Sequence, residues 1–132
     1  MWHAIFHTKP IAKGRPRFSS NGHAYTPAKT RDAGNELKFM IMQKKPVLLF
    51  DQALHVEIVF TFLPPKTKPK NRIYPTVKPD CSNLVKCIED SCNGLVWTDD
   101  CLITDLIIKK RYGEKESIEI FVIPIGGKVN GS

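Results

Sequence analysis

The 132-residue chain has no apolar run that approaches the length of a transmembrane helix, which needs about 20 consecutive apolar residues. Residues 1–7 also lack the charged start and the apolar core of a secretory signal peptide. The basic residues lie mostly in proline-containing segments, which do not form the basic amphipathic helix of a membrane-surface protein. We therefore expect a cytoplasmic protein that does not bind membranes.

The sequence also lacks the cysteine spacing of a zinc site. Its four cysteines include no Cys-x-x-Cys pair, and its four histidines all lie upstream of them at unrelated spacings. We therefore predict reduced thiols, with Cys81 and Cys92 packed in the protein core.

Acidic residues are absent from two basic segments, residues 9–31 and residues 64–79, although the chain contains 13 Asp and Glu. The basic residues of the two segments are Lys9, Lys13, Arg15, Arg17, Lys29 and Arg31, then Lys66, Lys68, Lys70, Arg72 and Lys78. One such segment would be an ordinary solvated loop. Two of them, in a chain of net charge +7, favour contact with a polyanion such as nucleic acid.

Hydrophobic periodicity predicts one domain of residues 1–125 and a flexible tail of residues 126–132. Alternating or β-prone patterns predict strands at residues 2–8, 53–63, 102–112 and 117–125, and the last two read as a hairpin around Gly113. Helical spacing predicts helices at residues 26–45 and 80–93. We predict an α+β fold in which two helices pack on a mixed or antiparallel sheet of about four strands.

The second predicted helix carries polar residues on one side. Asp80 follows a proline and is a favoured N-cap, and Asn93-Gly94 is a natural stop. At about 100° per residue, the apolar residues gather on one face, while Asn83, Lys86 and Asp90 share the opposite face.

A pair of acids, Asp99 and Asp100, precedes the strand that follows this helix. If that strand packs beside the helix, the pair can approach Asp80. Clustered carboxylates repel one another unless a cation lies among them, so the pattern indicates a Mg²⁺ or Mn²⁺ site for phosphodiester chemistry. The simpler alternative is that Asp80 is only a helix cap and that Asp99 and Asp100 only form a turn.

The pattern Lys-Pro-Asp-x-x-Asn-Leu-x-Lys, then Glu-Asp, Asn-Gly and Trp-x-Asp-Asp, runs over residues 78–100. It resembles the RusA family of Holliday junction resolvases, and Lys13-Gly14-Arg15-Pro16-Arg17 is similar to the family's basic N-terminal segment. The resemblance implies a homodimeric, divalent-metal-dependent endonuclease acting on four-way junctions and related branched DNA. It implies catalytic roles for Asp80, Lys86 and Asp100, and supporting roles for Asn83 and Asp90.

Ser82 departs from the family pattern, since many members have a second Asp there, and Cys101-Leu102 replaces a more polar pair. Asp99, Asp90 or a water could supply the missing ligand, and we expect a metal site of Asp80, Asp99 and Asp100. The expected DNA contacts are Lys13, Arg15, Arg17, Lys66, Lys68, Lys70, Arg72 and Lys78. Two alternatives stay open: a non-catalytic branched-DNA-binding protein with a decayed metal site, and a nuclease acting on RNA or flaps.

Overall fold

A computed structural model describes residues 1–12, 17–18, 24–25 and 28–125, and the predicted tail of residues 126–132 lies outside these ranges. The strand Leu54–Phe62 (β4) is the longest internal strand, because its sequence alternates between large apolar residues and residues that tolerate the outer surface. Val56, Ile58 and Phe60 point to one face and are fully buried. The predicted central strand is therefore confirmed.

The main sheet has the strand order β1-β6-β4-β5, with β1 at Trp2–Phe6, β5 at Ile103–Tyr112 and β6 at Ser117–Pro124. β6 is antiparallel to both β1 and β4, whereas β5 is parallel to β4. The sheet is thus mixed, as one of the two predicted forms required. A separate two-stranded ladder pairs Arg17–Phe18 (β2) with Ala24–Tyr25 (β3).

The prediction of a hairpin between the last two strands is wrong, because β4 lies between β5 and β6. Residues 113–116 cross the end of β4, where the Gly113 N–H donates to the Phe62 carbonyl oxygen at 2.9 Å. A Cβ atom on Gly113 would lie 2.6 Å from Cγ2 of Thr61, so a glycine is needed for this close crossing. A turn-like sequence does not distinguish a tight hairpin from such a crossing.

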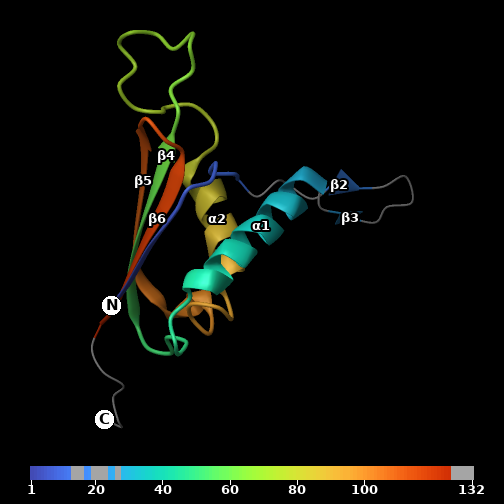
Figure 1. Ribbon diagram of the computed structural model, residues 1–132, viewed down its shortest axis with the longest axis vertical. Helices are drawn as coiled ribbons and strands as arrows, with labels where there is room; N and C mark the ends of the chain where they lie inside the picture. The colour runs from blue at the N-terminus through green and yellow to red at the C-terminus, as the bar shows by residue number, and fades with distance from the viewer. Residues whose placement is uncertain (13–16, 19–23, 26–27, 126–132) are drawn as a thin grey trace.

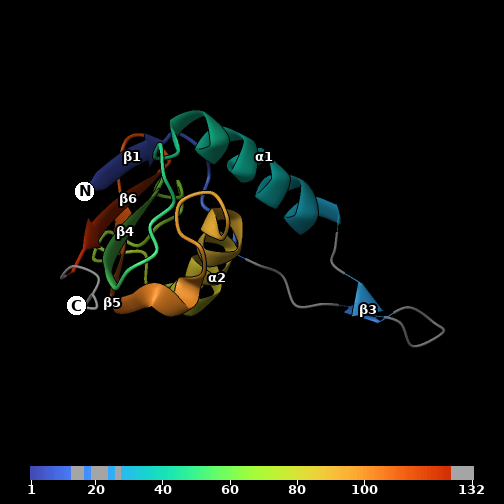
Figure 2. The same ribbon diagram turned by 90° about the horizontal axis from the view of Figure 1, so that it is seen from below.

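Two helices, Ala28–Lys44 (α1) and Cys81–Cys92 (α2), cover one face of the sheet (Figures 1 and 2). Leu37 and Ile41 of α1 are buried, as their helical spacing predicted, and so are Leu84 and Ile88 of α2. These side chains share one hydrophobic core with the inner face of the sheet. The α+β fold with two helices on a four-stranded sheet is confirmed.

The cysteines are all free thiols. Cys92 is buried in the core as predicted, Cys87 is buried beside it, and Cys81 is half-buried. Burial raises the pKa of Cys92, so its thiol stays protonated and unreactive.

The uncovered face of the sheet carries two polar side-chain pairs. His3 contacts Glu119 at 2.6 Å, and Lys109 contacts Glu57 at 2.9 Å. The same face also exposes Ile107 and Ile123, so it presents both polar and apolar side chains. Within the described part of the chain, no helix is long and apolar enough to cross a membrane.

Candidate active site

Asp80 occupies the N-cap position of α2, where its extended backbone (φ −73°, ψ 151°) ends the preceding loop. Its carbonyl oxygen accepts the first helical hydrogen bonds from Asn83 and Leu84. Its carboxylate, however, makes no capping hydrogen bond. The reading of Asp80 as only a helix cap therefore lacks the interaction on which it depends, and the positive end of the helix dipole favours an anionic group there.

Lys110 of β5 fixes the chain that leads into Asp80. Its ammonium donates to the carbonyl oxygens of Val77 and Pro79, at 2.9 Å in each case. These bonds join β5 to the end of the loop of residues 64–79, directly before the helix. Sequence analysis missed this role, because a lysine in an alternating strand reads as an ordinary surface residue.

The other end of α2 positions Asp100 through two side chains. The indole Nε1 of Trp97, which is fully buried, donates to Asn93 Oδ1 at 2.6 Å. This bond fixes the orientation of the Asn93 amide, and Asn93 Nδ2 then faces Asp100 Oδ2 at 3.4 Å. Asn93 is the residue that ends α2, so the Asn-Gly stop predicted from sequence also orients an acidic residue.

Asp99 and Glu89 add negative charge near Asp100. Asp99 Oδ1 accepts the Asp100 N–H at 3.0 Å and begins the short 3₁₀ helix Asp100–Leu102. Partial burial raises the pKa of Glu89, as do the carboxylates of Asp100 and Asp90. Glu89 was not among the residues predicted from sequence, because its position next to Asp90 did not indicate which direction it would face.

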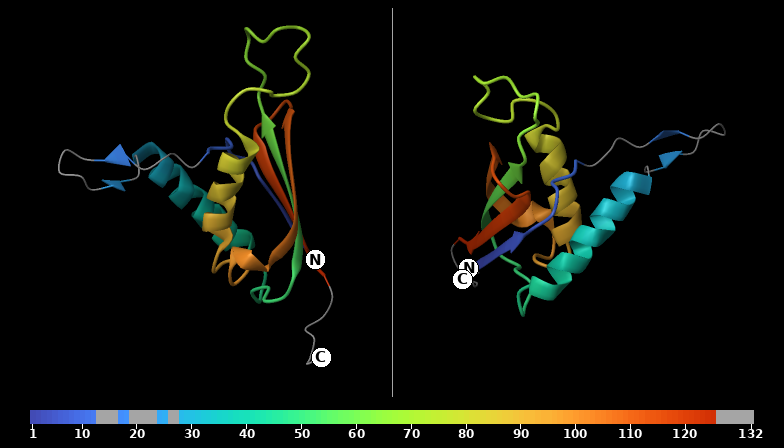
Figure 3. Two further views of the ribbon diagram at one scale, coloured as in Figure 1. Left: turned by 180° about the vertical axis from the view of Figure 1, so that it is seen from behind. Right: turned by 45° about the horizontal axis from the view of Figure 1, so that its top comes forward.

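The structure does not bring Asp80 and Asp100 together within one chain. α2 rises about 1.5 Å per residue, so about 20 Å separates the Cα atoms of its two caps, Asp80 and Asn93. Asp100 lies at the Asn93 end, from which the orange segment leads on into β5 (Figure 3). The expectation that the Asp pair approaches Asp80 is therefore wrong for a single chain, because β5 begins at the end of α2 that lies farthest from Asp80.

The predicted site is thus divided into two halves at opposite ends of α2. Among the described residues, no group of three His, Cys, Asp or Glu side chains is arranged to hold a metal ion. The half that contains Glu89, Asp99 and Asp100 nevertheless has the hard oxygen donors that Mg²⁺ prefers. These carboxylates lie near the negative end of the helix dipole, where a cation would relieve their repulsion.

The other predicted residues of α2 lie along its solvent side. Lys86 and Asp90 are exposed, and Asn83 is half-buried. Lys86 lowers the pKa of Glu89, against the effect of the acids, so its ammonium lies within electrostatic reach of the acidic half. Ser82, where many family members have an acid, is exposed in the first turn of α2, at the Asp80 end.

The basic loop of residues 64–79 projects beyond the ends of β4 and β5 (Figure 1). Lys66, Lys70 and Lys78 are exposed. Lys68 is used within the loop, since its ammonium donates to the Arg72 carbonyl oxygen at 2.7 Å. Lys13 and Arg15 lie outside the described residues, and so does the side chain of Arg17.

Comparison with known proteins identifies the family. The family model for the endodeoxyribonuclease RusA matches residues 7–123, which is most of the chain. The chain belongs to the RusA endodeoxyribonuclease family. A relative in Bacillus subtilis (strain 168), the "Uncharacterized protein YqaN", is 29% identical over 127 residues, covering 86% of this chain and 89% of the relative.

Membership of the RusA family implies an endodeoxyribonuclease, an enzyme that hydrolyses phosphodiester bonds in DNA. The matched region of this RusA family member includes both halves of the predicted site, which lie at the two ends of α2, and the basic loop. The resemblance seen in residues 78–100 is therefore confirmed at the level of the family.

Proposed function

We propose that the protein is a divalent-metal-dependent crossover junction endodeoxyribonuclease that resolves Holliday junctions and related branched DNA. The observation that carries the proposal is the presence of Asp80, Lys86 and Asp100 inside the region that matches the family. The structure adds a reason to separate these residues from ordinary capping and surface roles. Asp80 makes no capping bond, and Asp100 is oriented by the half-buried Asn93, whose side chain is fixed by the buried Trp97.

Asp80 and Asp100 are the residues we propose to hold Mg²⁺ or Mn²⁺, with Asp99 as a further ligand. The bound ion would polarise the scissile phosphate and lower the pKa of an attacking water. Asn93 contacts one oxygen of Asp100, and the other oxygen would bind the ion. Lys86 would stabilise negative charge that develops on the phosphate.

The separation of Asp80 from Asp100 supports a homodimer in which each site is shared. A carboxylate oxygen lies about 2.1 Å from Mg²⁺, so two carboxylates on one ion cannot stand at opposite ends of α2. We propose that Asp80 of one subunit meets Asp100 of a second copy. A two-fold dimer would then present two identical sites to the two equivalent strands of a four-way junction.

Exposed apolar residues in the last two turns of α1 and directly after it are suited to a subunit contact. Val47 is 97% exposed, Leu48 is 80% exposed and Phe39 is 65% exposed. Exposed apolar side chains that form a contiguous patch often mark protein interfaces, and Val47 and Leu48 are neighbours in the chain. Lys66, Lys70, Arg72 and Lys78 would hold the DNA backbone, because phosphate contacts orient a duplex without reading its sequence.

Single substitutions test the proposed carboxylates. Asp80→Asn and Asp100→Asn should each remove nicking of a four-way junction and leave junction binding near normal or tighter, because each removes a metal ligand and a negative charge near phosphate. Asp105→Asn is the matched control. Asp105 lies on β5 and pairs with His55 of β4 at 3.3 Å, on the face of the sheet that the helices do not cover. Full nicking by either of the first two variants would contradict the proposed site.

Ser82 favours one alternative, a non-catalytic branched-DNA-binding protein whose metal site has decayed. The proposed function expects an active wild type and a Ser82→Asp variant that retains metal-dependent nicking. The alternative expects an inert wild type, in which Ser82→Asp creates nicking. A nuclease acting on RNA or flaps is distinguished by cleavage of those substrates in preference to junctions.

A further inference from the structure

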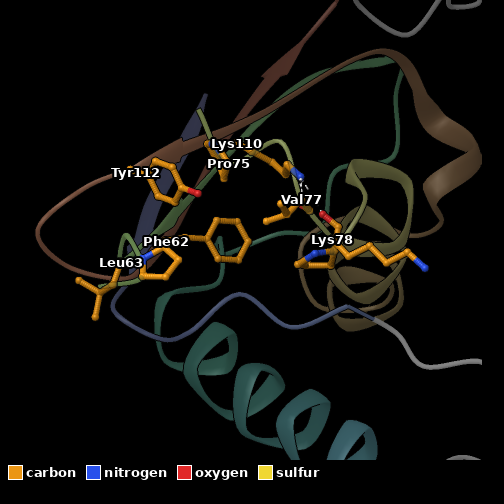
Figure 4. A pocket seen from close by; sticks show the side chains of 9 residues that line it. Phe62, Leu63, Pro75, Val77, Lys78, Lys110 and Tyr112 are labelled. Atoms are coloured by element: carbon orange, nitrogen blue, oxygen red, sulfur yellow. Dashed lines mark hydrogen bonds between the residues drawn. The ribbon is translucent and has the colours of Figure 1, made fainter. Parts of the chain in front are cut away.

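A small apolar pocket opens beside the Asp80 end of α2 (Figure 4). It has a volume of about 150 Å³ and is formed by the ends of β4 and β5 together with the last residues of the basic loop. Phe62 and Tyr112 provide aromatic walls, Pro75 and Pro79 provide aliphatic walls, and Lys78 lies at the margin. Nothing in the proposed hydrolysis uses this pocket.

The hydroxyl of Tyr112 is an unusual feature of the pocket. Its oxygen is buried, yet it has no hydrogen-bond partner among the described residues. Figure 4 shows the hydroxyl directed toward the space between Pro75 and Phe62. Buried polar groups are nearly always hydrogen-bonded, so an unpaired hydroxyl in a pocket indicates a missing partner.

The surroundings of the pocket are suited to a nucleic acid. Val77, Lys78 and Lys110 also line a wider hollow that contains Asp80. The ammonium of Lys68 lies 5.8 Å from the centre of the Tyr112 ring. A DNA strand whose phosphate lies near Asp80 would therefore pass the mouth of the pocket, between cationic groups.

We propose that this pocket receives one nucleobase, unstacked from the DNA at the branch point. An apolar cavity of about 150 Å³ admits a benzene ring, which is the size of the six-membered ring of a base. The base would lie against Phe62 and Tyr112, since bases stack on aromatic side chains whatever their sequence. In the free protein the Tyr112 hydroxyl is covered, and a small shift of the surrounding side chains would uncover it for a polar atom on the edge of the base.

This inference rests on the proposed function and gives it a physical basis for selecting branched DNA. Removing a base from a continuous duplex requires breaking its pairing and its stacking on both sides, whereas a base at a branch point has already lost part of both. The pocket is therefore more accessible to a base at a junction than to one in linear duplex. The protein would therefore bind junctions in preference to linear duplex, because a junction more readily supplies an unstacked base to the pocket.

A binding cycle in EDTA tests the proposal without requiring cleavage. Tyr112→Phe keeps the ring and removes the hydroxyl. Tyr74→Phe removes a hydroxyl from a residue that is 65% exposed and lines the wider hollow but not the pocket, so it is the comparison variant. Each protein is titrated by fluorescence anisotropy against a four-way junction and against junctions with one abasic nucleotide at successive positions around the branch point. Melting temperatures are recorded for all three proteins.

We expect Tyr112→Phe to weaken binding of the intact junction by roughly three- to ten-fold, the effect of removing one hydrogen bond. At one abasic position, wild-type affinity should fall and Tyr112→Phe should cause no further decrease. Any decrease in affinity caused by Tyr74→Phe should be the same on the intact junction and on every abasic junction. The melting temperature of Tyr112→Phe should not fall, because the change removes an unpaired buried hydroxyl.

Two results would overturn the pocket: unchanged affinity of Tyr112→Phe for the intact junction, or the same decrease in affinity on the intact junction and on every abasic junction. A protein that shows the expected cycle but never nicks DNA would retain the pocket and lose the proposed hydrolysis. A protein that nicks junctions without the cycle would retain the hydrolysis and lose the pocket. Absence of junction binding would contradict both.

Discussion

Mixing two inactive variants provides a sensitive test of a site shared between subunits. The Asp80→Asn protein keeps Asp100, and the Asp100→Asn protein keeps Asp80. In a mixed dimer with shared sites, one site combines both substitutions and the other combines both native carboxylates. Each variant alone should be inactive, and the mixture should regain nicking.

The structure determines how much activity the mixture should regain. Two carboxylates on one Mg²⁺ have oxygens within about 4 Å of each other, since each lies about 2.1 Å from the ion. The two caps of α2 are separated by about 20 Å, and Asp100 is held at the far one. Random exchange would make about half of the dimers mixed, and each mixed dimer has one intact site out of two. The mixture should therefore contain about a quarter of the intact sites present in the same amount of wild-type protein.

The assay is nicking of an end-labelled four-way junction after subunit exchange, with a differently tagged pair of Asp80→Asn proteins as the control. The restored activity should nick one strand per binding event, because each mixed dimer has a single intact site. If the subunits exchange and the mixture remains inactive, the shared site is wrong. In that case Asp80 and Asp100 would not bind the same metal ion.

Three further predictions concern other residues. Lys110→Met should slow nicking and lower the free energy of unfolding by about 1 kcal/mol, because it removes both bonds to the loop before Asp80, whereas Lys109→Met on the opposite face should leave nicking unchanged. Replacing Lys66 and Lys70 with Ala should make log affinity less steep against log salt by about 0.9 for each phosphate that the protein no longer binds, and an unchanged slope would refute their role in DNA binding. In EDTA, Glu89→Gln should raise the free energy of unfolding at neutral pH and have less effect below about pH 4, since the raised pKa of Glu89 makes its ionisation unfavourable in the folded state. Equal effects of Glu89→Gln at both pH values, measured by denaturant unfolding, would contradict that reasoning.

Local patterns were sufficient to predict the elements that bear the site. The alternation of Val56, Ile58 and Phe60 identified β4, and Asp80 and Asn93 marked the two ends of α2. Such signals depend on a residue and its near neighbours in sequence. They were reliable here because the buried faces of the strand and helix meet a single core.

Two errors in the sequence-based account have one cause. β4, α2 and β5 form a crossover in which the two strands are parallel, and the spacing of motifs does not distinguish this from an antiparallel connection. The crossover moves β5 away from β6 and excludes the hairpin. It also starts β5 at the end of α2 opposite Asp80, so Asp99 and Asp100 cannot reach Asp80 in the same chain.

The roles of Lys110 and Tyr112 were beyond sequence reasoning for a different reason. Lys110 bonds to carbonyl groups 31 and 33 positions earlier in the chain. Tyr112 is distinguished by its buried hydroxyl, which has no hydrogen-bond partner among the described residues. Both properties depend on the three-dimensional arrangement of β5 and the loop, and neither residue belongs to a recognisable motif.

The central claim is tested most directly by nicking of a labelled four-way junction and a matched linear duplex, each in Mg²⁺, Mn²⁺ or EDTA. A metal-dependent junction endonuclease should make paired, symmetric nicks in the junction with either metal, none in EDTA, and few in the linear duplex. Junction binding without nicking in either metal, or equal cutting of the linear duplex, would contradict the account.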